Sequence, residues 1–342
     1  FIEEGAGGVR YFRARSAEAD SQALGDESVA IGARSVAGGA SSLASGDGAV
    51  TTDGATAAIA IGQGAVVGTA SATAPDGAGG VAIGRAASAA GNRTIALGDG
   101  ARVASEFVAD ALAIGTGASV SGAQSSQATA IGFRATANAG NATALGALAA
   151  ANGRGSIAIG QATANGGNAF AAGSGAQAIS PNGIALGTGA GVGTRGTEAG
   201  DRTSHIAIGT GAGTNVVGNQ TTAIGFQAGT GVLGDQNIAI GSQAGTAVKG
   251  DFNIAIGYRA NQGAGALDRG TAIGALASAS SDSAAFGYNA RTTGVSAVAI
   301  GTEASAAGQG VALGRSAFAE GGSAAIGFNS RALATDGVGT SF

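Results

Sequence analysis

The strongest constraint on the fold is a repeat of small residues at a spacing of seven. In the stretch SVAIGARSVAGGASSLASG, residues 28–46, Ala30, Ala37 and Ala44 stand seven apart, and the glycine two positions after each alanine keeps the same step. A three-residue mark, Ala-Ile-Gly or Ala-Leu-Gly, then recurs at intervals mostly between 13 and 17 residues. The repeating unit is therefore about 14 residues, made of two similar halves of seven.

Each half reads as a short strand followed by a tight corner. Alternation in residues 28–32 places Val29 and Ile31 on one side of the strand and Ala30 on the other. The β-branched residues favour strand, and the following "ARS" or "GDG" favours a turn. Two halves make one flat coil. Roughly 19 such coils, stacked as parallel strands about 4.8 Å apart, predict an all-β parallel roll on the order of 90 Å long. A long helix is excluded, because each glycine would cost it roughly 1 kcal/mol.

Composition excludes several other classes of protein. The 342 residues include 67 glycines but only two prolines, with 11% charged residues and a net charge of -4. Disorder would need more charge and more proline, and collagen would need glycine at every third position. The absence of cysteine excludes disulfides and thiolate metal sites. The mildly acidic balance argues against a nucleic-acid partner, and without an apolar stretch of 18 residues we expect no membrane contact by this part of the chain.

The narrow coil predicts which side chains face inward. Two seven-residue halves leave room only for Ala, Gly and Ser between them, because protein interiors are close-packed. The larger aliphatic residues of the marks must then face outward and form an apolar stripe, which a monomer rarely leaves in water. We expect further copies of the same chain to cover it. The predicted subunit-contact residues are Ile31, Ile61, Ile83, Leu97, Ile114, Ile131, Leu145, Ile159, Leu186, Ile208, Ile224, Ile240, Ile256, Ile273, Ile300, Leu313 and Ile326.

Several stretches resemble a known family. ADSQALGDESVAIGARSVAGG (residues 19–39), SIAIGQATANGG (156–167) and GVALGRSAFAEGG (310–322) are similar to the YadA-like head repeats of trimeric autotransporter adhesins. The resemblance implies a left-handed parallel β-roll of three intertwined chains. It also implies display beyond the outer membrane of a Gram-negative bacterium, a role in virulence, and attachment to host cells or extracellular matrix. Collagen-binding members carry Asn before Ser-Val-Ala-Ile-Gly, where this chain has Glu27.

The resemblance also divides the chain. Residues 1–20 are expected to be an N-terminal cap or lead-in, residues 21–331 the head repeats, and residues 332–342 the end of the head before any neck or stalk. Because the sequence starts at Phe1 without a signal peptide, we expect a piece of a longer protein. The 16-residue copies from Thr222 to Asn261 are interpreted as a second sub-type of the same roll, with a longer corner carrying Gly-Asp.

Few residues could carry chemistry. The single histidine, His205, lies in the longest insertion and is expected to be a polar loop residue just before a strand, not a catalytic group or metal ligand. We therefore expect no enzyme activity and no cofactor. The long corners, Asp53–Asp76 and Val192–His205, are better candidates for partner contact, because loops carry variable function. The candidate partner-binding residues are Arg195, Glu198, Asp201, Arg202 and His205 in that corner, and Arg13 and Arg15 near the N-terminal end.

Two other functions were weighed against an adhesive head. A left-handed β-helix acyltransferase would also be trimeric, but its period is six residues with eighteen per coil, and the period here is seven. An ice-binding solenoid would need regular threonine ladders, whereas threonine here is scattered. The sequence therefore favours a homotrimeric adhesin head that binds host-surface or matrix molecules by multivalent contact.

Overall fold

The computed structural model describes residues 18–69, 77–194, 204–263, 267–333 and 340–341. They form an all-β parallel solenoid of about 21 turns with no helix, which confirms the predicted fold class and exceeds the predicted number of coils. The chain divides into two compact units, residues 1–135 and 136–342. The left hand of the roll and its threefold assembly stay predictions. Among the described residues there is no helix with the length and hydropathy to cross a membrane.

In the first unit, each turn has one longer and one shorter strand. The longer strands are β2 (Val29–Ile31), β4 (Leu43–Ser45), β6 (Ile59–Ile61), β8 (Val81–Ile83), β10 (Ile95–Leu97), β12 (Leu112–Ile114) and β14 (Thr129–Ile131). The shorter strands are β1 (Gln22–Ala23), β3 (Val36–Ala37), β5 (Val50–Thr51), β7 (Val66–Val67), β9 (Ser88–Ala89), β11 (Arg102–Val103) and β13 (Ser119–Val120).

The second unit continues the same alternation at its two ends but not in its middle. One sheet contains β16 (Thr143–Leu145), β18 (Ile157–Ile159), β20 (Phe170–Ala172), β22 (Ile184–Leu186), β23 (Ile206–Ile208), β24 (Thr222–Ile224), β25 (Ile238–Ile240), β26 (Ile254–Ile256), β27 (Thr271–Ile273), β28 (Ala284–Phe286), β30 (Val298–Ile300), β32 (Val311–Leu313), β34 (Ala324–Ile326) and β36 (Thr340–Ser341). The shorter strands are β15 (Thr136–Ala137), β17 (Ala150–Ala151), β19 (Thr163–Ala164), β21 (Gln177–Ala178), β29 (Arg291–Thr292), β31 (Ser305–Ala306), β33 (Phe318–Ala319) and β35 (Arg331–Ala332).

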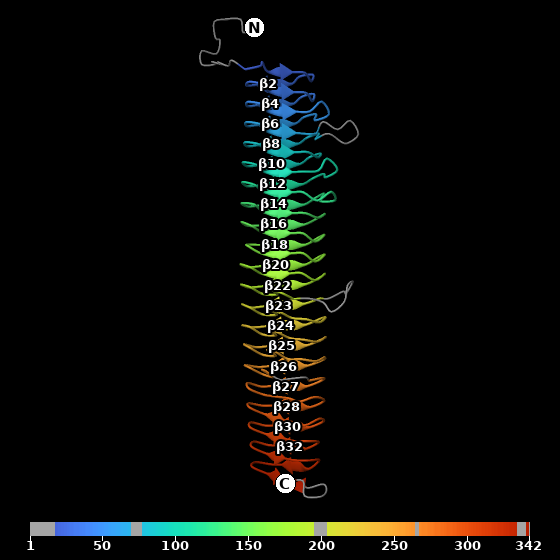
Figure 1. The fold of residues 1–342 in the computed structure, drawn as a ribbon, viewed down its shortest axis with the longest axis vertical. Helices are drawn as coiled ribbons and strands as arrows, with labels where there is room; N and C mark the ends of the chain where they lie inside the picture. Colours follow the sequence, from blue (N-terminus) through green and yellow to red (C-terminus); the bar gives the residue numbers. More distant parts are fainter. Residues whose placement is uncertain (1–17, 70–76, 195–203, 264–266, 334–339, 342) are drawn as a thin grey trace. The chain divides into compact units, whose positions relative to one another are not determined.

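Strands of successive turns pair in parallel and in register, so equivalent residues stack. In the first unit, Ala96 of β10 pairs with Ala82 of β8 on one side and Ala113 of β12 on the other. The shorter strands form their own parallel ladder, as in the pairing of β9 with β7 and β11. Within each unit the labelled strands of the longer series follow one another in chain order (Figure 1). Side chains that share a position in the repeat therefore form ladders.

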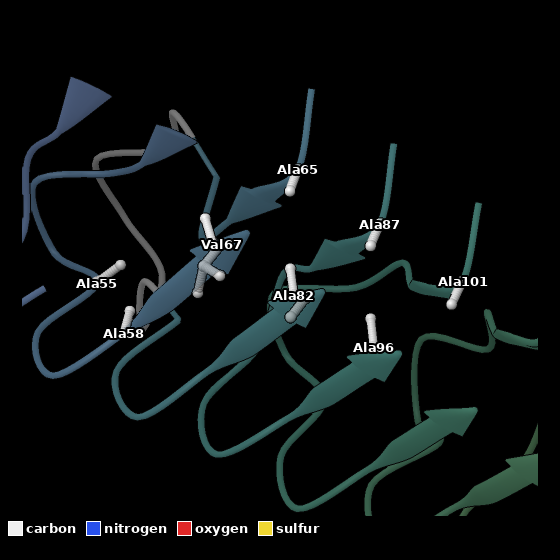
Figure 2. Packing of buried hydrophobic residues seen from close by; sticks show 10 residues of the cluster. Ala55, Ala58, Ala65, Val67, Ala82, Ala87, Ala96 and Ala101 are labelled. Carbon is white, nitrogen blue, oxygen red and sulfur yellow. The ribbon is translucent and has the colours of Figure 1, made fainter. Parts of the chain in front are cut away.

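The interior between the two ladders is built mainly from alanine. In the first unit, Ala60 and Ala82 of the longer strands are fully buried, as are Ala65 and Ala87 of the facing segments. The methyl groups of Ala65, Ala82 and Ala87 lie between the two layers of chain (Figure 2). The predicted small-residue interior is confirmed, with one correction: several shorter strands bury valine. The fully buried Val67 shows that the interior beside the shorter strands has room for valine as well as alanine.

The glycine of each mark is required by two features of the backbone. Gly46 has a φ of +134°, which side-chain-bearing residues rarely adopt. A Cβ built on Gly46 would lie 2.6 Å from the carbonyl oxygen of Gly62, the equivalent glycine in the next turn. Both the sharp corner and the close stacking of turns therefore exclude a side chain there.

The two corners of each turn differ in how much they vary. The corner after a longer strand has four residues, as in 62–65, and is shortened only at 160–162 among the described turns. The corner after a shorter strand ranges from residues 320–323 to residues 68–80. The extra residues of the 17-residue repeats fall there, at 104–111 and 121–128, which confirms the prediction that longer repeats add residues at a turn.

The 16-residue turns depart from this plan. Their parallel ladder through β23, β24, β25 and β26 is unbroken, so they continue the same sheet. The shorter strand is reduced to single bridges that join Val217, Leu233 and Lys249. The expectation of a longer Gly-Asp corner is wrong, because the additional residues form a turn at 229–231, before the bridge. This turn precedes Val232, which is 1% exposed and fills the interior.

Candidate functional site

The most prominent surface of each unit is an apolar ladder on the longer strands, here called the aliphatic face. It consists of the first and third residues of each longer strand, which point away from the alanine interior. None of the seventeen predicted subunit-contact residues is buried. Their exposed fractions include 43% for Ile31, 45% for Leu145 and 42% for Ile300. The sequence prediction that these side chains remain outside a single chain is therefore confirmed, while their contact with other copies stays a prediction.

The aliphatic face is wider than the seventeen residues. First-position residues such as Val29 and Ile157 are also exposed, at 48% and 39%. In β20 the third position is only Ala172, but Phe170 occupies the first. In β28 the order is reversed, with Phe286 third. The alternation of residues in each strand already indicated that the first positions face outward, but the predicted subunit-contact residues included only third positions.

The opposite sheet is chemically different. Its outward residues are mostly polar or small, for example Arg102, Ser119 and Thr163. The exceptions are Val36, Val50 and Val66 in the first unit and Phe318 in the second. The two sheets therefore differ in the chemistry of their outward faces.

Exposed rings lie at the corner directly after the mark glycine. They are Phe133, Phe226, Tyr258, Tyr288 and Phe328, each between 47% and 65% exposed. Arginine guanidinium groups cover some of these rings: Arg134 lies 5.4 Å from the ring centre of Phe133, and Arg259 lies 5.1 Å from that of Tyr258. Sequence reasoning missed these residues, although an aromatic directly after the mark glycine was a usable signal.

Ion pairs between neighbouring turns fix several corners. Arg34 donates to Asp47, Arg85 to Asp99, Arg93 to Asp110 and Arg269 to Asp282, with closest N–O distances from 2.5 to 2.8 Å. In each pair the aspartate is one turn further along the chain. The hydrogen bond from Arg93 lowers the pKa of Asp110, and that from Arg269 lowers the pKa of Asp282. These charges are therefore satisfied within the chain.

His205 lies directly before β23, as predicted, but it is not a surface loop residue. Its side chain is 7% exposed, and its Nδ1 accepts a hydrogen bond from the Thr221 backbone N–H at 3.4 Å. Burial lowers its pKa, opposed by the backbone of Gly218 and the charge of Asp235. Its position directly before a longer strand could have indicated burial, since the small polar residues at that position in other turns face the interior.

The surroundings of His205 do not form a reaction site. The cavity it lines with Ser180, Thr194 and Gly183 has a volume of about 10 Å³, which holds at most one water molecule. Within the described ranges, no group of three or more His, Cys, Asp or Glu residues could hold a metal ion. The candidate residues Arg195, Glu198, Asp201 and Arg202, together with Arg13 and Arg15, lie outside the described residues.

The stacked parallel turns, the alanine interior and the aliphatic face define a β-solenoid repeat protein. The family model described as the YadA head domain repeat matches residues 19–35, 23–49, 76–101, 126–149, 137–163 and 281–304. These matches recur in both units and support a YadA-like head domain. This family is one of adhesins and not of enzymes. A search among curated proteins gives no match to the chain.

Proposed function

We propose that this chain is the head of a surface-displayed trimeric adhesin. Three copies would cover one another's aliphatic faces, and the assembled head would attach to host cells or extracellular matrix. The single observation that carries the proposal is the aliphatic face itself, which runs through the longer strands of both units without a covering segment among the described residues. Similarity to the YadA head repeats supports the number three and the expectation of a passenger region beyond the outer membrane.

The energetics favour self-association. A residue such as Ile159, 39% exposed in one chain, would gain on the order of 1 kcal/mol if the remaining surface were covered. Many equivalent residues per chain would add to a large apolar interface of the kind that obligate oligomers use. Because the repeat is regular, identical chains present matching ladders to one another.

Attachment would follow from repetition. A trimer presents every exposed corner three times, and several weak contacts made together raise the overall affinity without any single strong site. The candidate partner-binding residues of the long corner at 192–205 remain part of this proposal. These residues are proposed because the corner that carries them is long and polar in the sequence.

The assembly is tested by a matched pair of substitutions in one turn. In a single chain, Ile159→Asp changes a half-exposed side chain and would cost little. In the proposed trimer it places three carboxyl groups in a dry interface, each costing several kcal/mol. Light scattering should therefore give a three-chain mass for the unchanged protein and loss of that mass for Ile159→Asp.

Asn165→Asp is the control, because Asn165 is exposed and its Oδ1 accepts a hydrogen bond from Asn152 that an aspartate can still accept. It should leave the mass unchanged. A one-chain mass for the unchanged protein at micromolar concentration would contradict the assembly. Adhesion is tested separately, by binding of the purified protein to an array of matrix proteins and host-cell glycans.

A further inference from the structure

An open polar groove lies on the second unit, at the variable corner of the turns between β15 and β20. It has a volume of about 490 Å³ and is lined by Asn141, Arg154, Gly155, Gly167 and Asn168. Arg154, Asn141 and Asn168 are exposed. No apolar side chain contributes to its lining. We call it the Arg154 groove.

Stacking of equivalent corners creates the groove. The Asn168 backbone N–H donates to the Arg154 carbonyl at 2.8 Å, and the same bond joins Gly155 to Gly140 and Asn182 to Gly167. Arg154 therefore shares its position with Gly140 in the turn before and Gly167 in the turn after. Without a side chain in either neighbouring turn, the arginine is left with open space beside it.

Arg154 has no other charged residue near it in the sequence. It is the one charged residue in the sequence between positions 136 and 194. In the Arg–Asp pairs of this corner, both partners stand one residue later in the corner than Arg154 does. Arg93 and Asp110 hold the position that Gly155 and Asn168 hold here. Asn168, a neutral amide, therefore stands where Asp110 and Asp282 stand in those pairs. The turns on either side of Arg154 contain no aspartate or glutamate that could pair with it.

The amide of Asn168 is held beside the arginine. Its Oδ1 lies over Gly155, where a Cβ would approach it to 2.6 Å, so only glycine leaves room for this placement. Its Nδ2 lies 3.5 Å from Oδ1 of Asn182 in the next turn. The groove therefore combines one guanidinium fork with carboxamide groups, each of which carries both a donor and an acceptor.

We propose that the Arg154 groove binds the acid group of an acidic saccharide. The guanidinium would pair with a carboxylate or sulfate through two parallel hydrogen bonds, and the amides of Asn141 and Asn168 would bind neighbouring hydroxyls. A saccharide fits better than an acidic peptide, because hydroxyls match amides that both donate and accept, and the groove offers no apolar contact for peptide side chains. This deepens the proposed adhesin function and rests on it.

The test measures binding of purified full chain by calorimetry to four probes. They are a hyaluronan oligosaccharide (carboxylate only), a dextran sulfate oligosaccharide (sulfate only), neutral dextran and a short polyglutamate. We expect binding of at least one acidic saccharide and none of neutral dextran. Arg154→Gln should weaken that binding roughly tenfold or more, because it removes a charge-assisted pair. Arg154→Lys should retain part of it as a point charge.

Asn168→Asp is the sharpest variant, because aspartate occupies the same backbone conformation at Asp110 and Asp282. It should form an internal ion pair with Arg154 and lose saccharide binding as fully as Arg154→Gln. Arg291→Gln, at an exposed arginine of β29, is the control with the same change of charge and should have no effect.

Equal losses in the Arg154 and Arg291 variants would overturn the proposal, as would binding of neither acidic saccharide or equal binding of polyglutamate. The comparison of the carboxylate and sulfate probes identifies the preferred acid group. If the protein is trimeric and adherent but binds no acidic saccharide, this inference fails and the proposed function stands. If the protein is monomeric and non-adherent, the proposed function fails first.

Discussion

Two regions of the second unit solve the same packing problem differently. Between β15 and β21, each turn has two strands, and its interior is alanine, such as Ala144 and Ala151. Between β23 and β26, each turn has one strand and a single bridge, and its interior takes the valines Val216, Val232 and Val248. The comparison shows that the turns of the second region, which have only a bridge, bury a valine in addition to alanine.

Side-chain hydrogen bonds replace part of the lost ladder. The buried residue before the longer strand is Ala142 before β16 and Ser156 before β18 in the two-strand region. In the one-strand region it is Asn237 before β25 and Asn253 before β26. The Oδ1 of Asn253 accepts from the Gly270 backbone N–H at 2.9 Å, and its Nδ2 donates to the Leu267 carbonyl at 2.8 Å. Each asparagine thus links its own turn to the next through both ends of its amide.

The largest expected effect compares two mark glycines. Gly241, in the one-strand region, has a φ of +124°, and a Cβ there would lie 2.7 Å from the Gly257 carbonyl oxygen. Gly160, in the shortened corner, has a φ of +77° and no atom nearer than 3.9 Å. We expect Gly241→Ala to lower the free energy of unfolding by about 3 kcal/mol and Gly160→Ala by about 1 kcal/mol. Urea unfolding measures both, and equal costs would contradict the role of stacking.

A smaller effect should separate the residues before the longer strands. Asn253→Ala leaves a buried N–H and a buried carbonyl without partners and should cost about 2 kcal/mol. Ser156→Ala should change stability by about 0.5 kcal/mol or less, because the buried Ser156 hydroxyl has no hydrogen-bond partner. Thermal unfolding of the two variants tests this. An Asn253→Ala variant with unchanged thermal stability would mean that the single bridges stabilise these turns without the asparagine.

The smallest effect concerns pH. His205 begins the same ladder as the asparagines, and burial lowers its pKa from the ordinary value of 6.5. The unfolded chain therefore takes up the proton first, so stability should begin to fall below about pH 6.5 and continue falling until the pH passes the lowered pKa of the folded state. His205→Asn keeps an acceptor and should remove this part of the pH dependence. Identical melting curves against pH for the two proteins would contradict it.

The sequence was sufficient for the features that depend on local alternation. The spacing of Ala30 and Ile31 determines which side chain fits a narrow coil, so the interior and the aliphatic face followed from it. The extra turn at 229–231 was misplaced because both it and the following Gly-Asp are turn-like in composition. Burial of His205 was missed because its neighbours in the preceding turns are separated by the longest insertion.

The candidate binding groove needed the structure for a different reason. Arg154, Asn168 and Gly167 look ordinary in a chain rich in glycine and asparagine. Their significance appears only when the register shows which residues of successive turns share a corner. A pattern along one turn is visible in the sequence, whereas a pattern across turns of unequal length requires the alignment that the hydrogen bonds provide.

The division between one corner of constant length and one of variable length has a practical consequence. In the two-strand turns, added segments enter beyond the last paired residue of a shorter strand and leave the stacked mark glycines untouched. We therefore expect foreign peptides inserted after Ala137 or Ala151 to be displayed at that edge with the repeat intact.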